Sequence, residues 1–196
     1  MASRSDGIRS RGAILEAASK LATVEGLDGL SIAGLADAVG MSKSGLFAHF
    51  RSKEELQLAT IEAAADLFGA RVLEPAAAAR SADERLRLLV GGYLDYLAAD
   101  TFPGGCFFAS VLAEVDMRPG RVRDRLVDFL GGWLRELEAT VRIAQAEGAL
   151  EPGEDPAQLV FEIEALLLYA NAQHVITRST EPIERARSAI ERRLER

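Results

Sequence analysis

The chain has 196 residues, 48% apolar and 27% charged, with a net charge of −7, a composition that is typical of a folded globular protein and excludes a disordered one. Its longest unbroken apolar run covers residues 165–170, whereas a bilayer span needs roughly 20 residues. The N-terminus also lacks the apolar core of a signal peptide. We therefore expect a cytoplasmic protein with no membrane partner. Cys106 is the only cysteine, which excludes an intrachain disulfide and a metal site of paired cysteines.

The first part of the chain has the periodicity of three helices. The first helix is expected over residues 8–25. Ser31 is placed to cap a second helix that stops at Gly40, and Ser42 is placed to cap a third, very short helix that runs to about His49. The inner face of the first helix is expected to carry Ile14, Ala17, Ala18, Leu21 and Val24.

Six further helices follow, and no segment alternates as a strand does. Ser52 and Glu55 form a capping box that opens a helix over residues 52–74. The later helices are expected over residues 81–99, 105–116, 119–148, 155–177 and 182–196. The fold class is therefore all-α, with a three-helix domain over residues 1–51 and a six-helix domain over residues 52–196, connected by the helix from 52 to 74.

The segment over residues 31–50 carries the sharpest functional signal. Two capped helices joined by a turn form a helix-turn-helix, whose second helix enters the major groove of DNA. That short helix begins with Lys43, Ser44 and Gly45, so little bulk separates its N-terminus from DNA. Helix N-termini also attract phosphate, and the candidates at such termini are Ser31, Ser42 and Lys53. From spacing alone, a plain helical hairpin whose serines only cap is the alternative.

The charge distribution points the same way. Residues 1–53 contain seven Lys or Arg and five Asp or Glu, a balance of +2, which leaves −9 for the rest of the chain. A more basic segment in an acidic chain favours nucleic-acid contact by that segment, although a difference of this size also arises by chance.

Residues 14–56, ILEAASKLATVEGLDGLSIAGLADAVGMSKSGLFAHFRSKEEL, resemble the N-terminal domain of the TetR family of transcriptional regulators. The later helices are similar in length and order to the ligand-binding and dimerisation domain of that family. Residues 103–106, 114–116 and 118–120 also resemble a subset of its members. The resemblance implies a repressor that binds a palindromic double-stranded DNA operator as a homodimer and is released by an unknown small-molecule effector.

The resemblance also implies roles for matched positions. The recognition helix would carry Ser42, Lys43, Ser44 and Gly45, while Ser31, Lys53 and His49 would touch phosphates. His49 has an alternative as a helix-end residue bonded to backbone. Phe47 stands where the family usually has Tyr, so a hydroxyl contact to phosphate is lost and apolar contact with a sugar or thymine methyl remains. Compensating phosphate contacts are expected from Arg4, Arg9 and Arg11.

The last two helices are the expected dimer interface. The helix over residues 155–177 is apolar on more than one side, which indicates burial from several directions, and that over 182–195 carries a narrower stripe. The residues concerned are Leu159, Val160, Ile163, Leu166, Leu167, Leu168, Tyr169 and Ala170 in the first, and Ile183, Ala186, Ile190 and Leu194 in the second. A four-helix bundle with the symmetry mate is favoured because a reader of two half-sites must be a dimer. The alternative is that both helices complete a monomeric core.

Aromatic side chains are the candidates for a ligand pocket, although each is more often part of a core than the wall of a ligand site. They are Phe68, Tyr93, Phe107, Phe108, Trp133 and Tyr169, with Asn171 and His174 as polar groups. Acidic Glu114 and Asp116 would suit a cation or are simply solvated. The glycine pairs at 91–92 and 131–132 indicate either close helix approach or a bend that opens a cavity, and close approach is the preferred interpretation.

An enzyme is the main rival class. Neither histidine follows a Glu by three residues, as a di-iron bundle requires, and neither a nucleophile elbow nor a phosphate-binding loop is present. We therefore expect no catalytic residues, no cofactor and no metal. A helical ligand carrier that has lost DNA binding is the third interpretation, and Ser42, Lys43 and Lys53 argue against it.

Overall fold

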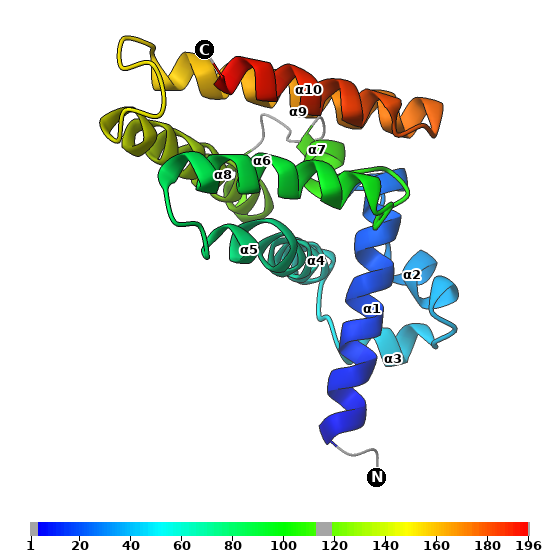
Figure 1. The fold of residues 1–196 in the computed structure, drawn as a ribbon. Helices are drawn as coiled ribbons and strands as arrows, with labels where there is room; N and C mark the ends of the chain where they lie inside the picture. The colour runs from blue at the N-terminus through cyan, green and yellow to red at the C-terminus, as the bar shows by residue number, and fades with distance from the viewer. Residues whose placement is uncertain (1–3, 113–118, 196) are drawn as a thin grey trace. The chain divides into compact units, whose positions relative to one another are not determined.

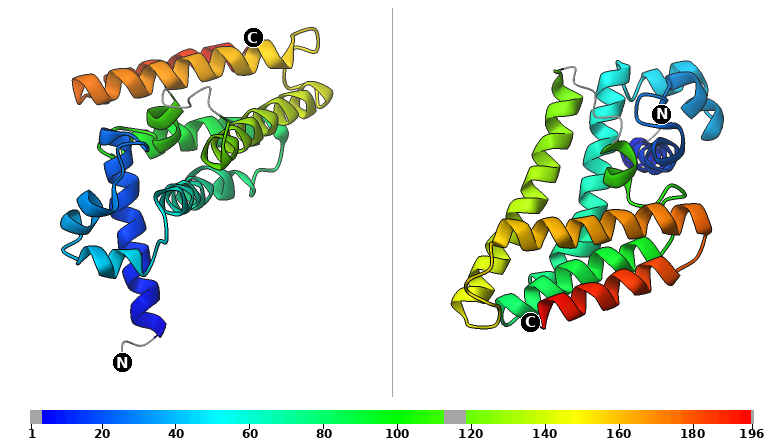
Figure 2. Two further views of the ribbon diagram at one scale, coloured as in Figure 1. Left: turned by 180° about the vertical axis from the view of Figure 1, so that it is seen from behind. Right: turned by 90° about the horizontal axis from the view of Figure 1, so that it is seen from above.

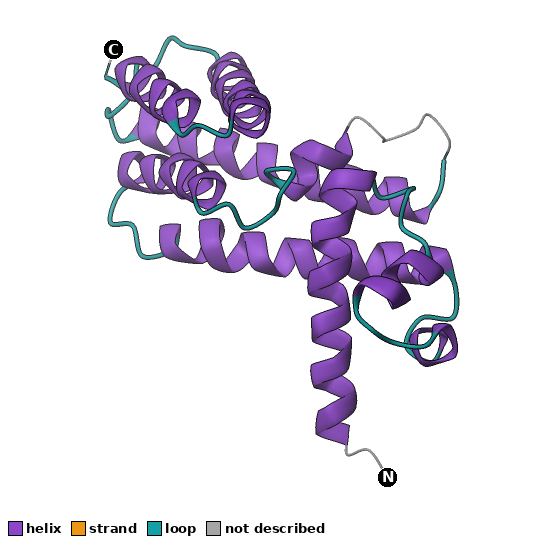
Figure 3. Cartoon of the chain, turned by 90° about the vertical axis from the view of Figure 1, so that its right-hand side faces the viewer, coloured by secondary structure: helices purple, strands orange, loops and turns teal. Residues whose placement is uncertain are grey.

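The computed structural model describes residues 4–112 and 119–195, and every regular element within them is a helix (Figure 1, Figure 3). The elements are α1 (Arg4–Glu25), α2 (Ile32–Ala38), α3 (Lys43–Phe47), α4 (Lys53–Phe68), the π-helix η1 (Gly69–Leu73), α5 (Glu74–Ala76), α6 (Ala82–Ala98), α7 (Phe107–Leu112), α8 (Arg121–Ala146), α9 (Pro156–Thr177) and α10 (Glu181–Leu194). α4, η1 and α5 follow one another directly and together form the helix predicted over residues 52–74. The predicted all-α fold class is confirmed, while the predicted helix end at Asp116 lies outside the described residues.

The chain divides into two compact units. The first comprises the residues up to Asp66 together with Phe102–Val127, and the second comprises Leu67–Thr101 together with Asp128–Arg196. The segment that contains α7 therefore belongs with the N-terminal helices, from which it is distant in sequence. The boundary between residues 51 and 52 stays a prediction.

In the first unit, α1 contacts both α2 and α7. Ile14, Ala18 and Ala22 are buried at the spacing of four residues that marks one face of a helix. The prediction that Val24 lies on this face is wrong, since Val24 is 66% exposed. The loop before α7 lies against Thr23 instead, so the buried face of the last turn of α1 is the one that carries Thr23.

The loop before α7 approaches the backbone of α1 closely. The amide of Gly104 donates a hydrogen bond to Oγ1 of Thr23 at 3.1 Å. A Cβ on Gly104 would overlap the carbonyl of Thr23, so glycine alone allows this approach. The hydroxyl of Ser110 then donates to the carbonyl of Gly104 at 2.8 Å, which links the loop to α7.

In the second unit, α9 and α10 lie side by side and α6 packs against both (Figure 2). The predicted apolar stripe of α10 is buried within the same chain: Ile183, Ala186, Ile190 and Leu194. Arg193 holds the end of α10 to α9 through a 2.7 Å ion pair with Glu162, and it also pairs with Glu154. This stripe therefore completes the core of a single chain.

Among the described helices, α9 alone is long and apolar enough to cross a membrane, a test that rests on length and composition only. Core helices of soluble proteins satisfy the same test. Seven of its side chains are buried in the second unit: Leu159, Val160, Ile163, Leu167, Ala170, Asn171 and His174. Its apolar character is accounted for in part by this core.

Candidate nucleic-acid interface and ligand region

Side-chain caps build the helix-turn-helix from both sides of its turn. Ser31 Oγ accepts a hydrogen bond from the amide of Gly34 at 3.0 Å, and Ser42 Oγ accepts one from the amide of Gly45 at 3.1 Å. Gly40, between the two helices, has a φ of 67°, the left-handed region in which glycine is favoured. The predicted caps are confirmed, and each serine Oγ accepts a hydrogen bond from its own helix.

The exposed side of α3 gathers the predicted recognition residues. Ser42, Lys43 and Ser44 are exposed, Gly45 is half-buried, and Leu46 on the opposite side is fully buried. Phe47, at the end of α3, is also exposed, by 53%, although it is aromatic. A large apolar side chain so placed at the end of a short polar helix is available for contact with another molecule.

The end of the helix-turn-helix is tied to α1 by Arg11, an anchoring role that the sequence analysis missed. Arg11 Nη1 donates a hydrogen bond to the carbonyl oxygen of His49 at 2.8 Å, and its guanidinium lies 4.4 Å from the ring centroid of Phe50. Both contacts occupy the guanidinium of Arg11, which the sequence analysis expected to contact phosphate. The His49 imidazole is half-buried, and its phosphate contact stays a prediction. The side chains of Arg4 and Arg9 lie outside the described residues.

The start of α4 is fastened to the turn between α1 and α2. Lys53 Nζ donates to the carbonyl of Asp28 at 2.5 Å, and Gln57 Nε2 donates to the carbonyl of Leu27 at 2.9 Å. Lys53 is nevertheless exposed, so a phosphate would compete with this carbonyl for the ammonium group. Its phosphate contact stays a prediction.

Three of the predicted pocket residues, Phe68, Tyr93 and Trp133, contact one another in the second unit. Phe68 lies 6.1 Å from Tyr93, 5.9 Å from Tyr96, 5.4 Å from Phe129 and 5.3 Å from Trp133 between ring centroids, in edge-to-face arrangements. We call these five side chains the aromatic cluster. The sequence analysis missed Tyr96 and Phe129, which helical spacing of three from Tyr93 and four from Trp133 would have found.

The other predicted pocket residues lie elsewhere. Phe107 and Phe108 belong to the first unit, where Phe107 contacts Phe108 at 5.2 Å and Phe102 at 6.2 Å. Tyr169 is 67% exposed and lines a groove of about 480 Å³ between α9 and α10. The structure thus divides the six predicted residues among three places, and their contact with a ligand stays a prediction.

A half-buried carboxyl group lies beside the aromatic cluster. Trp133 Nε1 donates a hydrogen bond to Oε1 of Glu164 at 2.7 Å. Burial raises the pKa of Glu164, and the hydrogen bond from Trp133 opposes that rise. The sequence analysis missed Glu164 because its indole partner is distant in the chain.

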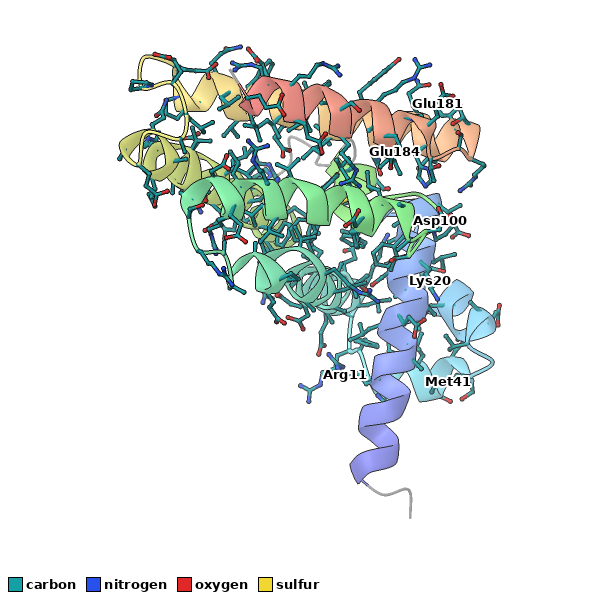
Figure 4. All side chains as sticks on the ribbon, viewed as in Figure 1. Arg11, Lys20, Met41, Asp100, Glu181 and Glu184 are labelled. Carbon is teal, nitrogen blue, oxygen red and sulfur yellow. The ribbon has the colours of Figure 1, made fainter. Side chains whose placement is uncertain are left out.

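His174, predicted as a polar group of the pocket, is instead fastened inside the second unit. Its Nδ1 lies 2.8 Å from the carbonyl oxygen of Ser179, and its Nε2 lies 2.9 Å from a carboxylate oxygen of Asp100. Asp100 lies just beyond the end of α6 (Figure 4). Asn171 is buried on α9, the helix that also carries His174. Glu114 and Asp116 lie outside the described residues.

The two glycine pairs differ in their surroundings. A Cβ on Gly92 would lie 3.5 Å from the Cα of Val72, which is ordinary contact with the π-helix η1 and fits the interpretation of close helix approach. Among the described residues, the atoms nearest to a Cβ built on Gly131 or Gly132 belong to the side chain of Arg135 on the same helix, so they give no sign of close helix approach at this second pair.

Comparison with known proteins agrees with these features. Residues 14–60 match the family described as "Bacterial regulatory proteins, tetR family", and residues 82–190 match the "Tetracyclin repressor-like, C-terminal domain". The transcriptional regulator AcuR of Cereibacter sphaeroides is 30% identical over 139 residues, which make up 70% of this chain and 63% of AcuR. The chain thus matches less than two thirds of the length of this curated relative.

Solved structures share the fold over nearly the whole chain. A TetR transcriptional regulator from Chloroflexus aurantiacus has a TM-score of 0.84 and 25% identity, and the match covers 95% of this chain and 94% of that one. AibR, solved in complex with isovaleryl coenzyme A and operator DNA, has a TM-score of 0.73 and 24% identity, with coverage of 92% and 95%. The resemblance drawn from residues 14–56 is confirmed, and this chain belongs to the TetR family of transcriptional regulators, with a helix-turn-helix DNA-binding domain at its N-terminus.

Proposed function

We propose that this protein is a repressor that binds a palindromic DNA operator as a homodimer and releases it when a small-molecule effector binds. The observation that carries the proposal is the exposed side of α3, where Ser42, Lys43, Ser44 and Phe47 stand open beside a buried Leu46. Such a helix fits the major groove, and exposed polar side chains at its N-terminus reach base edges and phosphates. Repression needs no further parts, because occupation of an operator is enough to block polymerase.

An unpartnered apolar face on α9 supports the homodimer. Phe161, Tyr169 and Ile176 are 69%, 67% and 74% exposed, and the less exposed Leu168 lies among them. Their spacing of seven or eight residues places them on one side of the helix. An exposed apolar stripe of this length is typical of a protein interface, and the helices over residues 156–177 and 182–195 are therefore our dimer interface.

The structure changes which residues of these helices would meet the partner. Leu167 is completely buried within its own chain, as is the stripe of α10 that begins at Ile183. Leu167 and this stripe therefore belong to the core of the single chain, which was the alternative to their use in a dimer interface. The dimer would use the opposite side of α9, the outer side of α10 and the groove that Tyr169 lines.

The effector role rests on the second unit. AibR was solved in complex with both isovaleryl coenzyme A and operator DNA, so a protein of this fold can bind a small molecule as well as DNA. The aromatic cluster supplies the apolar surroundings that small-molecule sites usually have. We assign the protein no catalytic activity and no cofactor, and we place it in the cytoplasm, where a DNA-binding regulator acts.

Selection of bound fragments from genomic DNA tests the proposal. We expect recovered sites to be palindromic, with half-site centres about 34–36 Å apart or modestly displaced from that spacing. Recovery of isolated single half-sites would contradict the homodimer. Titration of generic duplex DNA at low salt separates a regulator from a ligand carrier, since a carrier would not bind the duplex.

A further inference from the structure

The buried ring of His174 faces two hydrogen-bond acceptors at once. Its Nδ1 lies 2.8 Å from the carbonyl oxygen of Ser179, in the turn between α9 and α10, and its Nε2 lies 2.9 Å from a carboxylate oxygen of Asp100. A carbonyl and an ionised carboxylate only accept hydrogen bonds, whereas a neutral imidazole carries one N–H donor and one acceptor. Only the cationic ring, with a proton on each nitrogen, can therefore donate to both oxygens.

The backbone is strained at both segments that His174 contacts. Asp100 has a φ of 48°, and Arg178, which precedes Ser179, has a φ of 55°. Both values lie in the left-handed region, which is unfavourable for residues other than glycine. Such strain persists only where surrounding contacts hold it, and it is typical of segments that change state. The two contacts of His174 are placed to hold these segments.

Asp100 is the charged group that contacts the ring. The helices α6 and α10 pack against α9, and their acids near this end are paired with arginines. The charged residues around the contact, apart from Asp100, are Asp95, Arg178, Glu181, Glu184, Arg185 and Arg187. The protonation of the ring is therefore opposed to one carboxylate on the page of contacts it makes, that of Asp100.

We propose that His174 is a proton-dependent latch between the end of α6 and the turn that joins α9 to α10. The cationic ring holds both segments. The neutral ring keeps the stronger, charge-assisted bond from Nε2 to the Asp100 carboxylate and releases the carbonyl of Ser179. The charge of a histidine ordinarily changes between about pH 5 and 8, so the turn is held at the acidic end of this range and loosened at the alkaline end.

The turn that loosens belongs to the proposed dimer interface. Ser179 and Glu181 line the groove of about 480 Å³ to which Tyr169 also contributes. The regulatory part of this inference rests on the proposed homodimer: a fall in pH tightens the turn and thereby strengthens the dimer, as protonation of histidine does at other pH-sensitive interfaces.

Amide hydrogen exchange tests the latch within a single chain. The amide of Arg178 donates to the carbonyl of His174, and the amide of Glu181 donates to Oγ of Ser179. Protection factors of these two amides, which correct for the effect of pH on intrinsic exchange, are compared at about pH 6 and about pH 8. We expect protection to be about tenfold lower at the higher pH, because one hydrogen bond is lost. Equal protection at both pH values overturns the proposal.

Asp100→Asn is the variant that separates the latch from any general effect of pH. The amide of asparagine can donate to a neutral Nε2, which leaves the proton on Nδ1 for the carbonyl of Ser179, and asparagine tolerates the left-handed backbone. We expect the turn of this variant to stay protected at both pH values. His49→Gln is the matched control, since His49 is the only other histidine, and the turn should keep its pH dependence. A pH dependence that survives Asp100→Asn, or one that disappears in His49→Gln, overturns the role of His174.

Sedimentation velocity of the unaltered chain and of Asp100→Asn tests the link to the dimer. We expect the unaltered dimer to dissociate about tenfold more readily at about pH 8 than at about pH 6, and Asp100→Asn to remove this difference. A dimer whose affinity ignores pH while the turn responds to it would reject the regulatory link. A chain that is monomeric at both pH values would reject the homodimer, whereas the exchange measurement decides the latch by itself.

Discussion

Arg11 and His49 are joined by a hydrogen bond of 2.8 Å from the guanidinium of one to the backbone carbonyl of the other. The bond links the middle of α1 to the residue two positions beyond α3, and the same guanidinium lies over the ring of Phe50. The segment that follows α3 is therefore held to α1 by this side chain. This relationship leads to the first prediction.

Arg11→Ala should destabilise the protein by about 1–2 kcal/mol, because a charge-assisted hydrogen bond and a cation–π contact are lost together. Urea denaturation followed by circular dichroism measures the change. Lys20→Ala is the control, since Lys20 makes only an exposed ion pair with Glu16 one turn away, which contributes about 0.5 kcal/mol or less. Equal effects of the two substitutions would mean that Arg11 does not anchor α3.

Lys53→Ala tests whether this lysine leaves the carbonyl of Asp28 for a phosphate when DNA binds. If it neutralises one phosphate, affinity should fall similarly on all sequences and the salt slope should shrink by about one. Fluorescence anisotropy at several salt concentrations gives the slope. Arg142→Ala removes an exposed cation of α8 and should leave the slope unchanged. A slope that Lys53→Ala does not alter would remove Lys53 from the contacts.

Phe47→Tyr should strengthen operator binding, because the added hydroxyl can donate to a phosphate while the exposed ring leaves the core undisturbed. One hydrogen bond to a charged group contributes about 1.5–3 kcal/mol, so a gain in affinity of roughly 10- to 150-fold is expected. Phe47→Ala should weaken binding and serves as the converse variant. If tyrosine weakens binding as much as alanine does, the ring edge does not face the DNA backbone.

Ile176→Asp should dissociate the homodimer. A charge would be placed on the exposed apolar face of α9, and removal from water of an unpaired carboxylate costs several kcal/mol. Ile143→Asp is the matched control, since Ile143 is also an exposed isoleucine but lies on α8, outside the proposed interface. Sedimentation velocity at micromolar concentration should give monomers for the first variant and dimers for the second. Leu167→Arg, by contrast, should unfold the chain, because Leu167 is buried in its own core.

Glu164 should make stability decline as pH rises. Burial raises its pKa in the folded chain above the ordinary value of 4.5. At a pH between the ordinary and the raised pKa, the folded chain therefore holds a proton that the unfolded chain has lost. Unfolding free energy therefore falls with pH across that window, and Glu164→Gln should remove this part of the decline. Urea denaturation of both proteins from pH 4.5 upward measures it. A difference between them that does not grow with pH would contradict the burial of this carboxyl group.

Glu62 should change stability with pH in the opposite direction to Glu164. The hydrogen bond from Arg125 lowers the pKa of Glu62, so its stabilising contribution is present at neutral pH and is lost as pH falls through the lowered pKa. Glu62 is half exposed, which limits the contribution to less than about 1 kcal/mol.

Local interactions explain why much of this protein can be read from its sequence. A serine cap such as Ser31 or Ser42 acts on an amide three residues away, so the cap and its helix are visible in one short stretch. The same holds for Ser52, whose Oγ accepts the amide of Glu55 at 3.1 Å. The helices, the helix-turn-helix and the candidate contacts on α3 all follow from such short spacings.

Tertiary structure alone decided which apolar face meets which partner. A helix that is apolar nearly all round does not reveal that Leu167 faces its own core while Phe161 and Ile176 face outward. Nor does periodicity bring Thr23 against Gly104, or Trp133 against Glu164, which are 81 and 31 residues apart. Such pairs depend on how whole helices pack, because burial and hydrogen bonding are settled by neighbours in space rather than by neighbours along the chain.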